Sequence, residues 1–293
     1  MATDERNFRS TYYEKVGCRS VEEKKSLNIL LKDKPLNRIK LKQFCLSFTV
    51  PSAQRSLLWN LILGVLPTYP DSREYVMEQR CAVFEDTKRA VKVMRYVDEN
   101  SPTARMFYVM WLLENKRLHP DTNVNEDSHF VSIADALLRV LDNHTEIYWI
   151  AKGFYEFTKE IQTDFPKLKE LTFTLLEKED TLLHKHLESH NILQNLPMEK
   201  WYTSCFAGMI SDPALMRIWD KICGGSRKIV VFVLLVSLKT LRMSIMRCTT
   251  SQEVQDIIEK KKEDQDDLIV NKAIESWQNN KSHNEFMVHR KDN

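Results

Sequence analysis

The stretch LMRIWDKICGGSRKIVVFVLLV, residues 215–236, decides the fold class of this chain. Its first part places apolar residues at helical spacing, which predicts an amphipathic helix over residues 214–222. Gly224 and Gly225 then end that helix, because glycine reaches left-handed backbone angles cheaply. The apolar run over residues 229–238 is β-branched enough for a buried strand, but its helical neighbours favour a central buried helix.

Helical patterns continue on both sides of this stretch. Apolar residues recur at helical spacing over residues 52–62, 130–141 and 170–188, and capping boxes mark helix starts at Ser20–Glu23 and Thr250–Glu253. The 293 residues include only 6 glycines and 9 prolines, too few for the turns of a large sheet. The sequence therefore predicts an all-α protein. Its candidate core positions include Val83, Phe84, Val91, Met94 and Trp219.

Changes in composition divide the chain into four parts. We predict a polar arm over residues 1–19, a main helical domain over 20–248, a C-terminal helical extension over 249–280 and a disordered tail over 281–293. In the extension, the charge-dense segment EKKKEDQDD is expected to be solvated. A short amphipathic helix follows it, with the expected core positions Leu268, Ile269, Ala273 and Trp277.

Charge and hydropathy exclude several classes of partner. The formal net charge is +2, so no global attraction to nucleic acid or to a membrane surface is expected. The N-terminus lacks the apolar core of a signal peptide, and the run 229–238 is about half of the roughly 20 residues that a transmembrane helix needs. The six cysteines form no CxxC pair, which indicates reduced thiols. We expect a cytoplasmic protein without a transmembrane segment.

The sequence carries no motif for independent catalysis. His186 and His190 share a helical face, but Leu187 stands where a metalloprotease motif has Glu, so a structural cluster is favoured over a metal site. The Gly224–Gly225 pair lacks the spacing of a phosphate loop, and no nucleophile elbow or catalytic-cysteine signature occurs. We therefore expect no metal, no cofactor and no enzymatic activity of the chain by itself.

The segment TARMFYVMWLLENK, residues 103–116, is apolar around most of a helix. Such a helix is normally buried, and core packing of the whole stripe is favoured; the alternative is a second face that meets a partner. In that alternative, Met106, Met110 and Leu113 form the core stripe. The partner-binding face would then consist of the exposed side chains Phe107, Tyr108 and Trp111.

Three segments together resemble TBC domains. VPSAQRSLLWNLILGVLP (50–67) carries Arg55, Trp59 and Gly64 at the positions of the family's opening motif. MEKWYTSCFAG (198–208) resembles a second family segment, and Arg217-Ile-Trp-Asp220 before an apolar helix resembles a third. The resemblance covers about residues 30–245 and is closest to the TBC proteins that form the third subunit of the tuberous sclerosis complex. It implies an all-helical TBC domain.

The resemblance also implies positions for two catalytic residues. TBC proteins activate Rab GTPases with an arginine finger and a glutamine finger, which neutralise developing charge and orient the attacking water. VFEDTKR keeps the spacing of the arginine motif through Val83, Asp86 and Arg89, with Lys88 or Arg95 as alternative fingers. In the glutamine motif, Ser128 stands at the glutamine position, and it is too short to orient water as an amide does.

The residues around Ser128 are predicted to start a helix instead. Asn125 is the expected N-cap, and Glu126 and Asp127 lie in the first turn, where negative charge suits the helix dipole. His129 replaces the family's glycine. The site therefore looks degenerate.

Taken together, the resemblance implies a non-catalytic subunit. It implies direct binding to the C-terminal coiled coil of hamartin, contact with tuberin through the complex, and restraint of growth signalling through the GTPase Rheb. It also implies localisation at lysosomal or vesicle membranes through partners. The alternatives are an active GTPase-activating protein for a Rab, using Arg89, and a Rab-binding adaptor without catalysis.

Overall fold

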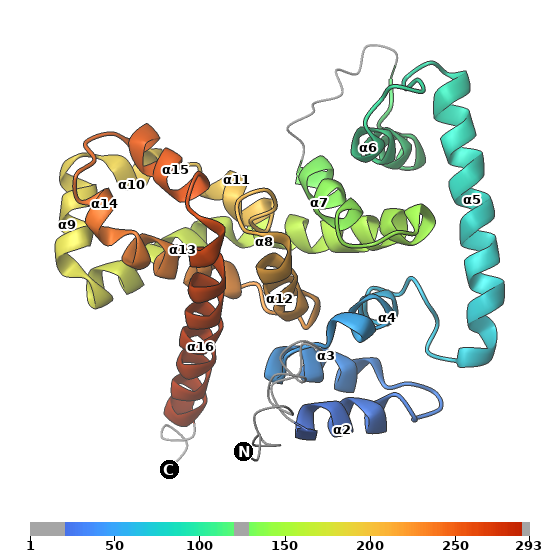
Figure 1. Ribbon diagram of the computed structural model, residues 1–293, viewed down its shortest axis with the longest axis horizontal. Helices are drawn as coiled ribbons and strands as arrows, with labels where there is room; N and C mark the ends of the chain where they lie inside the picture. The colour runs from blue at the N-terminus through green and yellow to red at the C-terminus, as the bar shows by residue number, and fades with distance from the viewer. Residues whose placement is uncertain (1–20, 120–128, 289–293) are drawn as a thin grey trace, which may run out of the picture. The chain divides into compact units, whose positions relative to one another are not determined.

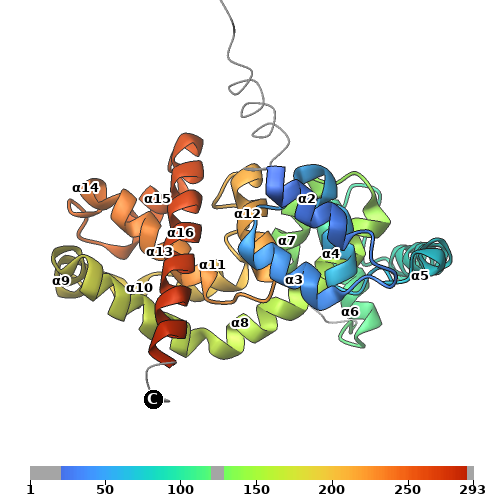
Figure 2. The same cartoon turned by 90° about the horizontal axis from the view of Figure 1, so that it is seen from below.

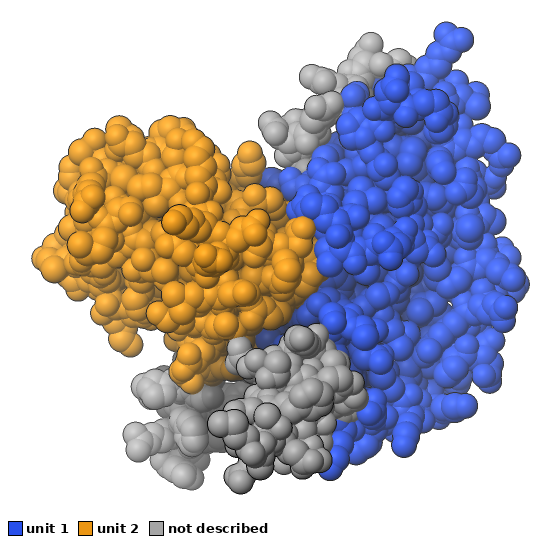
Figure 3. Space-filling model, viewed as in Figure 1, with its two compact units in different colours: residues 1–157, 220–225 blue, residues 158–219, 226–293 orange. Residues whose placement is uncertain are grey.

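The computed structural model describes residues 21–119 and 129–288, and these form helices joined by short connections, without a strand (Figures 1 and 2). The predicted all-α class is confirmed. The chain forms two compact units, residues 1–157 with 220–225 and residues 158–219 with 226–293 (Figure 3). The chain passes between the units inside α8 (His144–Glu179), inside α12 (Asp212–Cys223) and again after Gly225.

Unit 1 begins with α2 (Val21–Leu30), α3 (Arg38–Ser47) and α4 (Ser52–Ile62). The Asn37 side chain caps α3 by accepting a hydrogen bond from the Lys40 N–H at 3.1 Å. Gly64 follows α4 with φ at 75°, the left-handed geometry that favours glycine at a helix end. The core of these helices includes Leu27, Leu41, Phe44, Cys45, Leu58, Trp59 and Leu61.

A short 3-10 turn, η1 (Pro70–Ser72), leads into the long helix α5 (Arg73–Val93). Only Phe84 and Val91 of α5 are buried. The prediction that Val83 and Met94 belong to the core is wrong, because their side chains are 45% and 48% exposed. The apolar pattern of α5 is weak, so its sequence marks the inward face poorly.

Helix α6 (Thr103–Glu114) packs against both α5 and α7 (His129–Leu138), and this accounts for its apolar circumference (Figure 1). Phe107 is fully buried and Trp111 is 3% exposed, whereas Tyr108 is half-buried. The alternative of an exposed face at Phe107 and Trp111 is therefore wrong. Two neighbouring helices, rather than one core stripe, cover the segment.

The described part of unit 2 contains the remainder of α8, residues 212–219 of α12, and six further helices before its C-terminal helix. These are α9 (Thr181–Ser189), α10 (Ile192–Asn195), α11 (Met198–Thr203), α13 (Ile229–Thr240), α14 (Arg242–Ile245) and α15 (Ser251–Glu259). Every residue of α13 from Ile229 to Leu238 is buried, so the run is the predicted central helix and not a strand.

The last helix, α16 (Glu263–Val288), packs along α13 (Figure 1). It is longer than the short helix predicted from the sequence, and the predicted boundary at residue 280 falls inside it. Ile269, Ala273 and Trp277 face the core as expected, but Leu268 is 45% exposed. No helix among the described residues is long and apolar enough to cross a membrane.

The connection between α15 and α16 corrects another expectation. Lys261 forms an ion pair with Asp266 at 3.0 Å, and the two side chains are only 2% and 5% exposed. Asp266 also accepts a hydrogen bond from the Ser211 N–H at 2.8 Å. The charge-dense segment is thus solvated only in part, because one carboxylate and one ammonium of it are buried as an ion pair.

Candidate functional site

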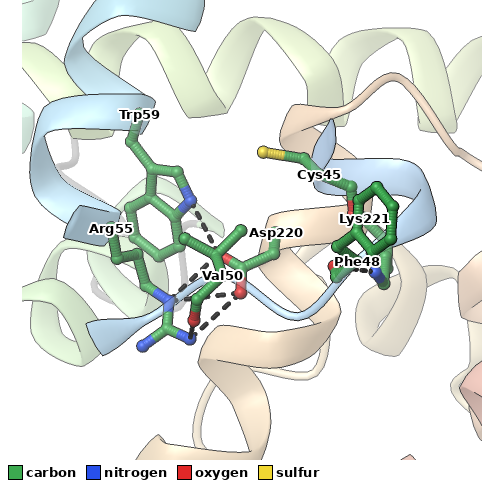
Figure 4. Close-up of polar contacts among 7 residues, drawn as sticks. All are labelled: Cys45, Phe48, Val50, Arg55, Trp59, Asp220 and Lys221. Atoms are coloured by element: carbon green, nitrogen blue, oxygen red, sulfur yellow. Dashed lines mark hydrogen bonds and ion pairs between the residues drawn. The ribbon is translucent and has the colours of Figure 1, made fainter. Parts of the chain in front are cut away.

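Two of the three sequence motifs meet at one buried carboxylate in unit 1 (Figure 4). Arg55 of α4 approaches Asp220 of α12 with Nε at 3.0 Å from Oδ1 and Nη2 at 3.0 Å from Oδ2. The indole N–H of Trp59, one turn along α4, donates to Oδ1 of the same carboxylate at 3.0 Å. Arg55 also donates to the Val50 carbonyl at 3.0 Å. These contacts fix the start of α4 against α12.

The environment of Asp220 makes this cluster structural. Asp220 is 1% exposed, and burial raises the pKa of its carboxyl, while the Arg55 guanidinium offsets part of that effect. A buried charge is tolerated when it is paired and hydrogen-bonded, as Asp220 is. Both of its oxygens already accept hydrogen bonds from protein donors. The arrangement anchors two helices.

Lys221, the next residue of α12, anchors α3 in the same way (Figure 4). Its ammonium donates to the carbonyls of Cys45 at 2.8 Å and Phe48 at 2.7 Å, near the C-terminal end of α3, where a cation also suits the helix dipole. Burial raises the pKa of the Cys45 thiol, so this cysteine is not a reactive thiolate.

Glycine is required where α12 ends. A Cβ at Gly224 would lie 2.8 Å from Leu46 Cγ and 3.0 Å from the Lys42 carbonyl oxygen, so the close approach to α3 excludes a side chain. Gly225 has φ at 106°. The glycine pair therefore serves helix packing and helix termination.

The candidate arginine finger lies on the outer face of α5. Arg89 forms an i,i+3 ion pair with Asp86, and the two side chains are 74% and 69% exposed. Val83, the apolar position of the same motif, is also exposed. Lys88 and Arg95 are the two alternative candidates for the arginine finger. Lys88 forms an ion pair with Glu85, with Nζ 3.6 Å from Oε2. Arg95 lies just after the end of α5 and has a φ of 61°.

The candidate glutamine-finger position, Ser128, lies outside the described residues, as do the predicted helix cap Asn125 and the first-turn residues Glu126 and Asp127. His129 is the first residue of α7. The structure brings Arg89 and Asp86 together.

Tyr108, Trp111 and Phe130 form an aromatic cluster with Tyr155 of α8. The rings of Tyr108 and Trp111 stack with centroids 6.1 Å apart, and Trp111 meets Tyr155 edge-on at 5.1 Å. Phe107 packs separately, against Phe84 at 5.7 Å. These residues build the core of unit 1.

The histidine segment on α9 is tied to the backbone. The His186 Nε2 donates to the Cys248 carbonyl at 2.9 Å, and the His190 Nδ1 donates to the His186 carbonyl at 2.9 Å. Over residues 21–119 and 129–288, no three His, Cys, Asp or Glu side chains gather as metal ligands would. The interactions of this segment are structural.

Sequence reasoning singled out Arg55, Trp59 and Asp220 as motif positions but did not foresee that they meet. The available signal was a pair of oppositely charged residues in two specific motifs, 165 positions apart. Lys221 gave no signal, because a lysine on an amphipathic helix is ordinarily solvated.

Comparison with known proteins identifies the class. The Rab-GTPase-TBC domain family matches residues 126–246. The chain is 38% identical to TBC1 domain family member 7 of Xenopus tropicalis over 93% of this chain and 94% of that protein, and 37% identical to the human protein of that name over the same shares. The chain therefore belongs to the TBC-domain family.

Solved TBC domains share the fold. The Ypt/Rab-GAP domain of Gyp1p matches with a TM-score of 0.61 and 13% identity, over 88% of this chain and 98% of that domain. A Chlamydomonas flagellar RabGAP TBC domain matches with a TM-score of 0.56 and 17% identity, over 93% and 95%. At this identity the likeness concerns the arrangement of helices.

Proposed function

We propose that this chain is a degenerate TBC-domain subunit that binds the C-terminal coiled coil of hamartin and stabilises the hamartin–tuberin complex. Tuberin is then the activator of Rheb, and this chain supports negative regulation of growth signalling without promoting GTP hydrolysis itself. It acts in the cytoplasm and reaches lysosomal or vesicle surfaces through its partners. The similarity to TBC1 domain family member 7 over nearly the whole of both chains carries the proposal.

The candidate fingers support a non-catalytic role. Ser128 replaces the glutamine whose amide would orient water, so one of the two groups needed for hydrolysis is missing from the sequence. Arg89 is engaged by Asp86 on a regular helix, and it would have to leave that ion pair to reach a nucleotide.

The outer face of α5 supplies the docking surface in this proposal. Tyr75 and Val93 are 66% and 76% exposed, and the 18 residues between them make five helical turns, so both lie on one side of the helix. Val83 is 45% exposed and lies about 80° around the helix from both of them. A helical partner recognises spaced apolar anchors of this kind, over a length of about 27 Å.

Binding to a hamartin coiled-coil fragment tests the proposal directly. We expect the full chain to co-elute with the fragment, and Val93→Glu to weaken binding without changing the melting temperature. Leu182→Glu is the matched control, because Leu182 is an apolar residue on α9 of the other unit that is also mostly exposed, at 66%. Absence of binding by the unaltered chain, or equal weakening by the two variants, contradicts the proposal.

Rab activation is the second candidate function, supported by the Rab-GTPase-TBC family match. Multiple-turnover GTP hydrolysis over a Rab panel separates it from the first. We expect no acceleration by the chain and no difference for Arg89→Ala. A working arginine finger is worth about 10³ to 10⁵ in rate, so acceleration abolished by Arg89→Ala would establish the activator. Capture of Rab–GTP without hydrolysis or hamartin binding would establish the adaptor.

A further inference from the structure

Unit 1 contains a cavity that the proposed function does not use. Its volume is about 300 Å³, and it lies where the end of α4, the end of α6, α5 and α8 meet. It shares no residue with the Asp220 cluster or with the outer face of α5. The side chains that define its chemistry are Arg80, Trp111, Glu114, Trp149, Lys152 and Glu156.

Arg80 is the distinctive group of this cavity. Its guanidinium lies 4.4 Å from the centroid of the Trp149 ring and donates one hydrogen bond, to the Gly64 carbonyl at 2.9 Å. Burial lowers the pKa of Arg80. Within residues 21–119 and 129–288 no carboxylate forms an ion pair with it. A half-buried guanidinium without a counter-ion favours an anion beside it.

The other cation is already neutralised. Lys152 forms an ion pair with Glu114, which also accepts a hydrogen bond from the Tyr148 hydroxyl at 2.9 Å. The Lys152 ammonium lies 4.0 Å from the centroid of the Trp149 ring. The indole N–H of Trp149 donates a hydrogen bond to the backbone carbonyl of Arg80 at 3.3 Å. Trp149 and Arg80 thus hold each other in place, and Lys152 adds no net attraction for an anion.

The walls restrict the charge and the shape of a ligand. A single carboxylate matches the charge and the planar fork of the Arg80 guanidinium, whereas a dianion such as a phosphate monoester would bring a second charge that Lys152 cannot balance, because Lys152 is already paired with Glu114. Trp111 and Trp149 contribute indole surface to the same lining. The volume is at the lower end of the range for small-molecule sites.

We propose that this cavity binds a small organic monocarboxylate, with the carboxylate on Arg80 and an apolar body against Trp111 and Trp149. Recognition depends on the charge and geometry of Arg80, and the indoles select for an apolar body over a hydrophilic one.

Ligand-observed NMR with the full chain tests the proposal at millimolar ligand concentration. The probes are benzoate, phenylacetate and hexanoate, each compared with its neutral amide, together with phenyl phosphate. We expect the carboxylates to bind at least about tenfold more tightly than the amides, since the charged hydrogen-bonded pair is lost with that change. We also expect them to bind more tightly than the phosphate, whose second charge has no partner on the lining. Equal binding of acid and amide, or no binding of any carboxylate, overturns the proposal.

Variants locate the binding. Arg80→Gln should weaken carboxylate binding about tenfold or more, while Arg247→Gln, which removes the same charge from an exposed position in unit 2, should leave it unchanged. Should Arg80→Gln fail to fold, Arg80→Lys keeps the charge but loses the planar fork, and intermediate affinity is expected. Unaltered affinity in a folded Arg80 variant overturns the proposal.

Discussion

At the scale of single residues, the buried charges of this chain are used to join helices that are distant in sequence. Asp220 joins α12 to α4 through Arg55 and Trp59, and Lys261 joins the α15–α16 connection to the Ser211 region through Asp266. Such pairs add little stability relative to apolar packing, but breaking one of them leaves an uncompensated charge. They therefore specify which helices pack together.

Asp220→Asn should lower the free energy of unfolding by about 3 to 5 kcal/mol, because the Arg55 guanidinium loses its counter-ion in a buried site. Urea denaturation followed by circular dichroism measures the change. The control Asp267→Asn removes a carboxylate that is 70% exposed in its pair with Arg217, and it should cost less than about 1 kcal/mol. Similar costs for the two variants would show that Asp220 is not held as a buried ion.

Trp219→Ala should cost about 3 to 5 kcal/mol, because the indole is fully buried and donates to the Cys205 carbonyl at 3.0 Å. Trp219→Phe keeps most of the volume and should cost less. Thermal melting and soluble yield of the two variants provide the measurement. A normal melting temperature for the alanine variant would contradict a core position.

At the scale of elements, the sequence predicts the helices more reliably than the faces they bury. The apolar run that forms α13 could be a helix or a strand by its own composition. The helical patterns on both sides of it are what favour the helix that is found. The faces of α5 and α6 depend on their neighbours: α6 is covered by two helices, and most of α5 is covered by none. The apolar circumference of α6 does favour burial on several sides, as found, whereas the weak pattern of α5 does not show which of its faces is buried.

In the candidate site, too, the motifs could be predicted from the sequence but the contacts between them could not. The motifs around Arg55 and Asp220 predict the family, but their contact is a tertiary fact that neither segment encodes alone. The cavity beside Arg80 gave no sequence signal, because its lining comes from four separate elements. For Arg89, spacing alone suggests a finger, and only the helix shows that Asp86 faces it one turn away.

The start of α15 allows a prediction for an element. The Thr250 side chain accepts from the Glu253 N–H, and the Glu253 carboxylate accepts from the N–H groups of Thr249 and Thr250, which completes the predicted capping box. Thr250→Ala should cost about 1 kcal/mol. Amide hydrogen exchange in α15 should rise in this variant, whereas Ser251→Ala should leave it nearly unchanged.

The same box has a pH dependence with a defined sign. The backbone N–H groups of Thr249 and Thr250 lower the pKa of Glu253 below its ordinary value. A carboxyl with a lowered folded-state pKa stabilises the fold at higher pH, and this contribution is lost as pH falls from the ordinary value through the lowered one. Hydrogen exchange in α15 should therefore increase on acidification, and Glu253→Gln should remove this part of the dependence. An unchanged profile in that variant would contradict the assignment.

At the scale of the whole molecule, the proposed docking surface lies apart from the buried side of its helix. The proposed docking side chains lie on α5 of unit 1, while the buried residues of that helix, Phe84 and Val91, face the opposite way. A substitution on the outer face can therefore change binding without removing core contacts. This separation makes stability and partner affinity independent observables.

Thermal unfolding in the presence of the hamartin fragment uses that independence. A partner that binds only the folded chain stabilises it by about 2.7 kcal/mol at 100 times the dissociation constant, which corresponds to roughly 5 to 10 °C in the melting temperature of a unit of this size. The shift should appear in the transition in which α5 unfolds. Val93→Glu should abolish the shift and leave the melting temperature of the unbound chain unchanged, whereas Leu182→Glu should keep the shift. A shift that persists in Val93→Glu would show that the docking surface is not the outer face of α5. A shift produced by Rab–GTP but not by hamartin would favour the adaptor function, because the melting temperature rises with any partner that binds the folded state.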